Sequence, residues 1–300
     1  MKKRLLFSLI LGIAAGAVGD LWGHVGDRIY PIWQLSDEEV TEIDLGDGSI
    51  QDWIDVMGPP TLLTSDFWAR DGYDPSDLGF RIWLAWHEAT GRIYVGMERF
   101  DDAYVFLEND LDCPGPYCHD AAVNLYVDGD HSGGDFMFVP GTYDTDKETW
   151  FYTFQEAQWF TAYTEIFEDT SPIELWYVSQ GSGGEKWFAE FPYAEAGGGV
   201  FGEDPTVSIL EFYVTPFDRL IRDSLDESVA SQLRPGQIIG FDIRIYDNDA
   251  ESKSNAYVLG QGPPVSADNF VDGLLMGADL PGDTAVESNT WARIKASFAR

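Results

Sequence analysis

The stretch NLYVDGDHSGGDF, residues 124–136, carries oxygen-bearing side chains directly after a run of strand-forming residues. Asp128, Asp130 and Ser132 follow a D-x-D-x-S spacing, and a Gly-Gly pair behind them permits a sharp turn. This is the ligand pattern of the first half of an EF-hand calcium loop. A complete EF-hand is excluded, because its twelfth position needs a bidentate glutamate and Val139 stands there.

The loop still predicts a site for a hard cation if further ligands reach it from elsewhere in the fold. Calcium takes about six to eight oxygen ligands, and the loop with Asp135 supplies only some of them. The alternative is an Asp/Gly hairpin turn whose charges are solvated.

A second acidic segment has the same character. Asp247, Asp249 and Glu251 place carboxylates at every second residue after another predicted strand. If both strands end at one edge of the sheet, the two segments share an ion or hold one each. Ordinary turn chemistry explains Asn-Asp equally well.

Catalytic motifs are not evident. The sequence contains no nucleophile elbow, phosphate-binding glycine loop or zinc-protease helix. Hydrolysis of a glycosidic bond needs a facing pair of carboxylates, and acidic residues are too abundant here to nominate one. The histidines, His24, His87, His119 and His131, are scattered. We therefore expect a protein that is not an enzyme.

The N-terminus predicts secretion. Lys2, Lys3 and Arg4 precede a short apolar run and an Ala-Gly-Ala exit ending at Ala17, which are the parts of a signal peptide covering residues 1–17. The apolar run is shorter than the roughly 20 residues that a membrane-spanning helix needs. We expect a secreted protein, extracellular or periplasmic, without membrane insertion.

The charge of the chain excludes some partners. The formal net charge is -34, with 52 acidic and 18 basic residues, and removal of the signal peptide takes away three basic residues and no acidic one. Such a surface repels phosphate backbones and anionic lipid, so nucleic acid is not an expected partner. Hydrophobic residues at 44% are sufficient to build a core.

The two cysteines are close together, in the segment Cys113-Pro-Gly-Pro-Tyr-Cys118. Behind a secretion signal this pair is expected to close a small loop as a disulfide. Half of a zinc site is the alternative, but the sequence has no second cysteine pair to complete it.

Alternating apolar and polar residues predict many short strands separated by Gly, Asp or Asn clusters. The expected fold is an all-β antiparallel sandwich of the jelly-roll type with one or two short helices, at Pro216–Leu220 and Ser224–Leu233. The expected strands are Arg81–Glu88, Arg92–Arg99, Ala103–Glu108, Ala122–Val127, Ile173–Val178, Lys186–Phe191, Thr206–Val214 and Ile238–Tyr246.

Aromatic residues gather on one predicted hairpin, formed by Ile173–Val178 and Lys186–Phe191. Because the chain has 11 tryptophans, we expect some to be exposed platforms on which sugar rings stack, while most remain in the core. The candidate ligand-binding residues are the platforms Trp176 and Trp187, with Arg81, Glu98 and Gln180 as polar neighbours.

Several landmarks, in order, resemble family 9 carbohydrate-binding modules and the related DOMON domains. EIDLGDGSIQDW (residues 42–53) is similar to the family's "IDG…DW" opening, and LAWHEATGRIYVGMERFDD (84–102) is similar to its paired strands. VNLYVDGDHSGGDF resembles the family's strand and loop ending in "sGG". ILEFYVTPFDRL (209–220) and GFDIRIYDND (240–249) resemble the late strands.

This resemblance implies a β-sandwich that binds sugars and holds calcium. It implies one module over residues 36–300, after an N-terminal extension at 18–35, with insertions near 110–120 and 140–170. No tryptophan of this chain aligns with the family's sugar-clamping pair. Haem-binding DOMON domains of electron transfer are a less favoured alternative, with Met97 and His87 as the axial ligands.

Taken together, these patterns predict a secreted carbohydrate-binding domain with calcium-stabilised loops, whose partner is a polysaccharide or other glycan. The competing function is structural. In that case calcium and aromatic patches drive self-assembly of a surface or filament protein, which binds no glycan.

Overall fold

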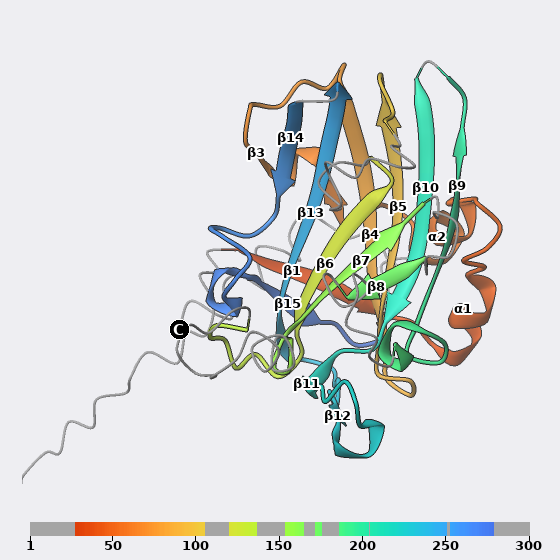
Figure 1. Cartoon of the computed structure of the whole chain (residues 1–300). Helices are drawn as coiled ribbons and strands as arrows, with labels where there is room; N and C mark the ends of the chain where they lie inside the picture. Colours follow the sequence, from red (N-terminus) through yellow and green to blue (C-terminus); the bar gives the residue numbers. More distant parts are fainter. Residues whose placement is uncertain are drawn as a thin grey trace, which may run out of the picture.

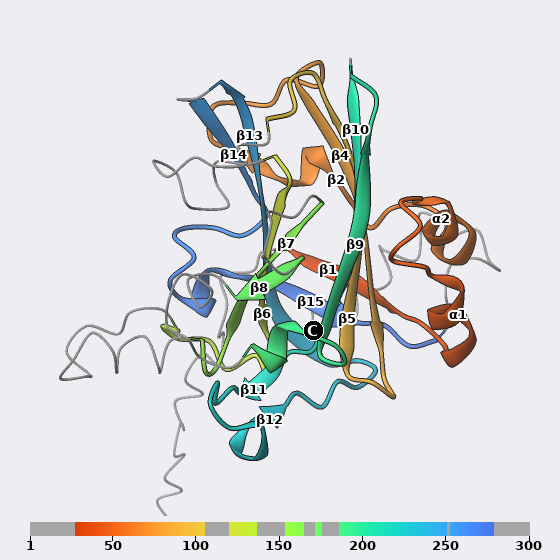
Figure 2. The same cartoon turned by 45° about the vertical axis from the view of Figure 1, so that its right-hand side comes forward.

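The computed structural model describes residues 28–105, 120–136, 154–164, 172–175, 186–203, 205–250 and 253–278. In this part of the chain the strands form two layers that pack face to face (Figure 1). Two short α-helices lie against the outside of one layer, as Figure 2 shows. The predicted all-β sandwich with one or two short helices is confirmed.

The first layer has strand order β8-β7-β6-β13-β15, with β14 and β3 continuing beside β13. Its strands are β8 (Ile173–Leu175), β7 (Gln158–Tyr163), β6 (Ala122–Asp128), β13 (Ile238–Ala250), β15 (Val271–Leu275), β14 (Lys253–Val258) and β3 (Trp68–Ala69). The second layer has the order β4-β5-β10-β9, with β2 beside β4. Its strands are β4 (Leu78–His87), β5 (Arg92–Asp101), β10 (Thr206–Val214), β9 (Ala194–Phe201) and β2 (Leu62–Leu63).

Strand β1 (Ile29–Gln34) joins the two layers. Its first residues pair in parallel with β15, from Ile29 opposite Asp272 onward, and its last two pair in parallel with β4. All other strand pairs in the described residues are antiparallel. The segment expected to lie in an N-terminal extension therefore contains a strand of the sandwich itself.

The two-residue period of the strands explains how both faces of the second layer are buried. On β10, Leu210, Phe212 and Val214 point into the space between the layers. Ile209 and Tyr213 alternate with them and pack instead against the helical cover. This layer therefore separates a main core from a smaller second core.

The helical cover consists of α1 (Asp37–Glu42) and α2 (Gln51–Met57). α1 begins at a capping box, in which Ser36 Oγ accepts from Glu39 N at 3.3 Å and Glu39 Oε2 accepts from Ser36 N at 2.8 Å. α2 buries Trp53 against the second layer.

The predicted positions of the two helices, Pro216–Leu220 and Ser224–Leu233, are wrong. Residues 216–220 contain strand β11 (Phe217–Arg219), which pairs with β12 (Val229–Ala230), and between them lies a 3-10 turn, η4 (Leu225–Glu227). Phe217, Leu220 and Leu233 each reach the main core, and the backbone between them pairs as β11 with β12 instead of forming helices.

The predicted aromatic hairpin is also wrong. Its first arm contains β8, which pairs with β7, but its second arm forms a 3-10 turn, η3 (Trp187–Ala189). Phe188 and Ala189 are consecutive and both buried, which an alternating strand does not allow on a one-faced sheet. The strand expected over Ala103–Glu108 is absent from its described part, residues 103–105, because β5 ends at Asp101.

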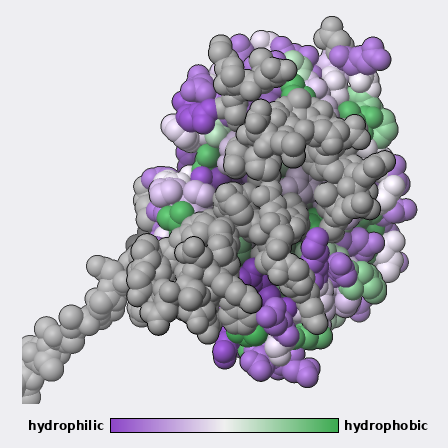
Figure 3. Space-filling model, in the orientation of Figure 1, coloured by the Kyte–Doolittle hydropathy of each residue, from purple (hydrophilic) through white to green (hydrophobic). Residues whose placement is uncertain are grey.

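The remaining predicted strands correspond to β4, β5, β6, β10 and β13. No helix in the described part of the chain has the length and apolar character needed to cross a bilayer. On the face drawn in Figure 3, the described surface is mostly hydrophilic, with small hydrophobic patches between the polar residues.

Candidate functional site

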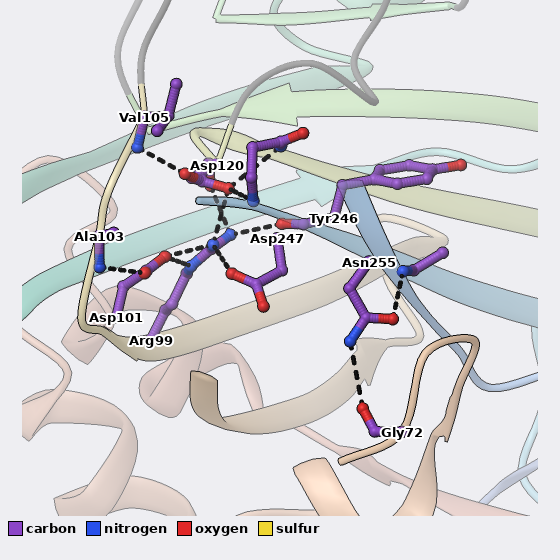
Figure 4. A network of polar contacts seen from close by, with 11 residues as sticks. Gly72, Arg99, Asp101, Ala103, Val105, Asp120, Tyr246, Asp247 and Asn255 are labelled. Carbon is purple, nitrogen blue, oxygen red and sulfur yellow. Dashed lines mark hydrogen bonds and ion pairs between the residues drawn. The ribbon is translucent and has the colours of Figure 1, made fainter. Parts of the chain in front are cut away.

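A buried arginine lies where β5 ends. The Arg99 side chain is fully buried and its guanidinium faces carboxylates from three segments, as Figure 4 shows. It donates through Nε to Asp101 Oδ2 at 2.8 Å, and Nη2 lies 2.9 Å from Asp120 Oδ1 and 3.5 Å from Asp247 Oδ1. Burial acts against the arginine's charge, but these carboxylates outweigh it and raise the pKa of Arg99.

Arg99 also ties the two layers together. Its Nη1 donates to the backbone carbonyls of Asp120 at 2.8 Å and of Tyr246 at 2.9 Å. Asp120 precedes β6 and Tyr246 lies on β13, so an arginine of the second layer is anchored to the first. The group is a structural junction as well as a charge cluster.

Asp247 is the member of this cluster that lacks hydrogen-bond donors. It is buried, and neither carboxylate oxygen accepts a hydrogen bond within the described residues. Burial raises the pKa of Asp247 to about 8, although Arg99 acts in the opposite direction. An orphaned buried carboxylate of this kind is satisfied by a proton or by a cation.

Two further carboxylates lie on the other side of Asp247. Oxygens of Asp77, Asp247 and Asp249 are all within 4.8 Å of one another. Burial, followed by the charge of Asp249, raises the pKa of Asp77. Asp247 therefore belongs to two groups of carboxylates, one with Asp101 and Asp120 and one with Asp77 and Asp249, and hard oxygen ligands of this kind are those that calcium takes.

The structure places the second acidic segment differently from the sequence expectation. Asp247 and Asp249 lie within β13, where Asp247 pairs with Asn255 of β14, rather than in a loop after the strand. Glu251 lies outside the described residues. Sequence reasoning missed Arg99, Asp77 and Asp120, because they are far from Asp247 in the chain and have no spacing signal.

The first acidic segment forms a tightly hydrogen-bonded turn. The Asp128 carboxylate accepts from the backbone N–H of Ser132 at 3.3 Å and of Gly133 at 2.7 Å, and Asp130 accepts from Ser132 N at 3.1 Å. Asp135 forms an isolated bridge to Ser266. The turn uses these oxygens, and calcium binding here stays a prediction.

The two acidic segments lie at opposite ends of one strand pair. β6 and β13 are antiparallel, with Asp128 opposite Gly240 and Val123 opposite Ile245, so Asp247 lies beyond the other end of β6. A single ion shared between the two segments is therefore excluded.

Among the predicted ligand-binding residues, Trp187 is half-buried at the edge of the main core. Its indole N–H donates to the Arg222 carbonyl at 2.9 Å, and its ring meets Phe188, Tyr193 and Phe217 edge to face. Trp176, Gln180, Cys113 and Cys118 lie outside the described residues.

The predicted polar neighbours contact each other. Arg81 on β4 and Glu98 on β5 are register partners and form a short ion pair through Arg81 Nε and Glu98 Oε2. The Arg81 guanidinium also lies 5.4 Å from the centre of the Trp83 ring.

Trp68 is an exposed tryptophan that sequence reasoning missed. It lies on β3 with 63% of its surface exposed, whereas the other described tryptophans are buried or half-buried. Next to it in the chain, the Arg70 guanidinium pairs with Asp71 at 3.3 Å. The local sequence SDFWARDGYD has no alternation and gave no signal of a platform.

Asn255 connects the segment after Trp68 with the carboxylate cluster. Its Oδ1 accepts from Asp71 N at 3.0 Å, and its Nδ2 donates to the Gly72 carbonyl at 3.2 Å, as Figure 4 shows for Gly72. Its register partner on β13 is Asp247. Asn255 therefore connects the segment that follows the exposed Trp68 with the strand that carries Asp247.

Comparison with solved structures gives fold relatives. The chain is similar to a family 9 carbohydrate-binding module from Caldicellulosiruptor kristjanssonii solved in complex with glucose, at 11% identity and a TM-score of 0.50, with 83% of this chain and 96% of that chain covered. A complex of a family 9 module from the same organism with cellotriose matches at 12% identity and a TM-score of 0.48, covering 85% and 97%.

Neither a family model nor a curated protein matches the sequence. The similarity to solved structures nevertheless confirms the resemblance drawn from the sequence landmarks, at the level of fold. The chain is therefore a β-sandwich whose fold is similar to that of a family 9 carbohydrate-binding module.

Proposed function

We propose that this protein is a secreted, non-catalytic carbohydrate-binding domain. In this proposal its glycan site includes Trp68 and its fold is stabilised by calcium. The observation that carries the proposal is the shared fold with a family 9 module that was solved with glucose bound. The signal-peptide pattern of residues 1–17 supports secretion.

Trp68 has the chemistry of a sugar platform. The C–H face of a pyranose stacks on a flat aromatic ring, while its hydroxyls bind carboxylates, amides and guanidinium groups. Arg70 and Asp71 offer such groups close to Trp68 in the chain. Their side chains are 50% and 64% exposed. Trp187, in contrast, has its indole N–H and ring already in contact with protein.

Calcium has a structural part in this proposal. Asp77, Asp247 and Asp249 would hold it through carboxylate oxygens. The bound ion would offset the repulsion between these carboxylates and their neighbours, which the single charge of Arg99 does not balance. Because Asn255 links Asp247 to the segment after Trp68, the ion would also fix the platform.

The test is binding of glucose, cellotriose and a wider glycan panel by the full chain in calcium. We expect Trp68→Ala to abolish binding with an unchanged melting temperature, since the ring is exposed. Phe191→Ala is the matched control, because Phe191 is 75% exposed and should leave binding intact. Trp187→Ala should lower the melting temperature through lost packing.

Two results would overturn the glycan-site proposal: wild-type binding that Trp68→Ala retains, or no binding to any glycan. The second result, combined with oligomers that appear in size-exclusion chromatography only with calcium, would favour the assembly function.

A further inference from the structure

A second group of carboxylates lies on the other side of the second layer, beneath the helical cover. Glu211 of β10 pairs with Gly96 of β5 on one side and with Gly197 of β9 on the other. A Cβ at Gly96 would meet the Trp53 ring at 2.6 Å, and a Cβ at Gly197 would meet the Leu45 carbonyl oxygen at 2.0 Å. The two glycines therefore allow Trp53 and the loop before α2 to close over Glu211.

Glu211 is fully buried and only half satisfied. Its Oε1 accepts the Trp53 indole N–H at 2.8 Å, while its Oε2 is buried with no hydrogen-bond partner. A carboxylate oxygen without a partner in a closed space indicates a group that the protein chain does not supply.

That oxygen does not face a basic group. Oxygens of Asp47, Asp52 and Glu211 are all within 4.8 Å of one another. The pKa of Glu211 depends first on its burial and on the Trp53 hydrogen bond, and then on the negative charges of Asp52, Asp47 and Asp44. Burial raises the pKa of Glu211 to about 8, as expected of a carboxylate placed among like charges.

Backbone N–H groups hold Asp47, in the loop before α2, and Asp52, in the first turn of α2. Asp52 Oδ2 accepts from Asp44 N at 2.8 Å and Asp52 Oδ1 from Trp53 N at 2.7 Å. Asp47 Oδ1 accepts from Ser49 N at 2.7 Å. Each carboxylate oxygen has a second lone pair, so these bonds orient the ligands without exhausting them.

We propose that Asp47, Asp52 and Glu211 form a binding site for a hard divalent cation, for which calcium is the best match. The donor set is all oxygen and comes from a loop, the first turn of α2 and a strand, which suits the flexible coordination of calcium better than the strict octahedron of magnesium. The ion would join the loop before α2 to β10 and complete the orphaned Glu211 oxygen.

This site is distinct from the cluster around Asp247. Gly96, beside Glu211, and Asp101, in the Arg99 cluster, are five positions apart on β5, which is roughly 17 Å along a strand. The two sites can therefore be tested separately, and neither result depends on glycan binding.

The experiment is calcium binding by the full chain after removal of metal with chelator, followed by isothermal titration calorimetry. Glu211→Gln keeps the size of the side chain and an oxygen for the Trp53 N–H but removes the charge. We expect it to lower the number of calcium ions bound by one, or to weaken that site by at least about tenfold. Asp47→Asn, an exposed substitution that does not disturb the core, should weaken the same site.

Asp55→Asn is the matched control, because Asp55 is exposed on the same helix as Asp52 and contacts Gln51. It should bind calcium like the wild type. Terbium luminescence excited through tryptophan gives a second readout, since Trp53 touches Glu211, and the emission should fall in Glu211→Gln. Wild-type stoichiometry and affinity in both Glu211→Gln and Asp47→Asn would overturn the site.

Discussion

The indole N–H of Trp53 donates a 2.8 Å hydrogen bond to Glu211 Oε1, joining α2 to β10 across a sequence separation of 158 residues. Both side chains are completely buried. The bond is a fully buried polar contact between the helical cover and the second layer, which also meet where Trp83 Nε1 donates to the Gly58 carbonyl and where His87 contacts Asp37.

Removal of this donor should destabilise the protein. Trp53→Phe leaves a buried carboxylate oxygen without its partner, which costs about 1–3 kcal/mol beyond the lost packing. The measurement is a double-mutant cycle of Trp53→Phe and Glu211→Met by urea unfolding, in which each single change removes one partner of the hydrogen bond. A coupling energy near zero would show that the hydrogen bond does not stabilise the fold.

The raised pKa of Glu211 gives a pH dependence in the metal-free protein. Its folded-state pKa of about 8 is above the ordinary glutamate value of 4.5, so the folded state holds a proton that the unfolded chain releases. This contribution to stability is fully present below pH 4.5 and is lost as the pH rises through about 8. In chelator, the stability of the wild type should fall relative to Glu211→Gln across this window. If the free energy of unfolding has the same pH dependence in both proteins, the pKa of Glu211 is not raised by burial.

Arg99→Met should be severe. It leaves Asp101 and Asp120 buried without their cation, and breaking such a group costs roughly 3–5 kcal/mol. Arg70→Met is the matched control, because the Arg70–Asp71 pair is exposed and such pairs contribute about 0–1 kcal/mol. Equal urea midpoints for the two variants would be inconsistent with a structural role for Arg99.

Gly197→Ala should displace the loop before α2. The added methyl would lie 2.0 Å from the Leu45 carbonyl oxygen, and such overpacking costs about 1–3 kcal/mol. Gly79→Ala, on β4 with nothing within 4 Å of the added methyl, should change stability by less than about 0.5 kcal/mol. Thermal unfolding of both variants separates the close approach from a general effect of glycine replacement.

Calcium should raise the melting temperature, because an ion bound only by the folded state stabilises it by mass action, by about 2.7 kcal/mol at 100 times its Kd. Asp247→Asn should reduce this gain without lowering the melting temperature in chelator, since the metal-free state loses a repelled carboxylate. Asp130→Asn, measured beside it, tests whether the Asp128 loop holds an ion too. If calcium raises the melting temperature of Asp247→Asn as much as that of the wild type, Asp247 is not a calcium ligand.

Strands with strong alternation were predictable from sequence, because burial on one or both faces repeats every two residues. β4 and β10 are examples, and both were expected within two or three residues of their observed bounds. Helix α1 was missed although Ser36 and Glu39 form a capping box, since the helix buries no residue and has no apolar period. The turn at Trp187 has a strand-like composition, but tertiary packing of Phe188 overrides it.

The candidate sites were less predictable, because their members meet only after folding. Asp247 and Asp249 were nominated from spacing, whereas Arg99 on β5 and Asp120 before β6 come from other parts of the chain and have no local pattern. Glu211 reads as one polar position in an alternating strand, and nothing in ILEFYV indicates that glycines on both neighbouring strands leave room above it. Trp68 lies in a segment whose composition predicts only a turn.

The parallel pairing of β1 with β15 has a consequence for the order of folding. Ile29 pairs with Asp272, so the link that β1 makes between the layers cannot form until β15 has been synthesised. Contacts of such long range carry a high loop-closure entropy and slow the search for the native state. Until they form, β15 and β4 each expose a free edge, so newly made chains have a period during which those edges are open to intermolecular pairing.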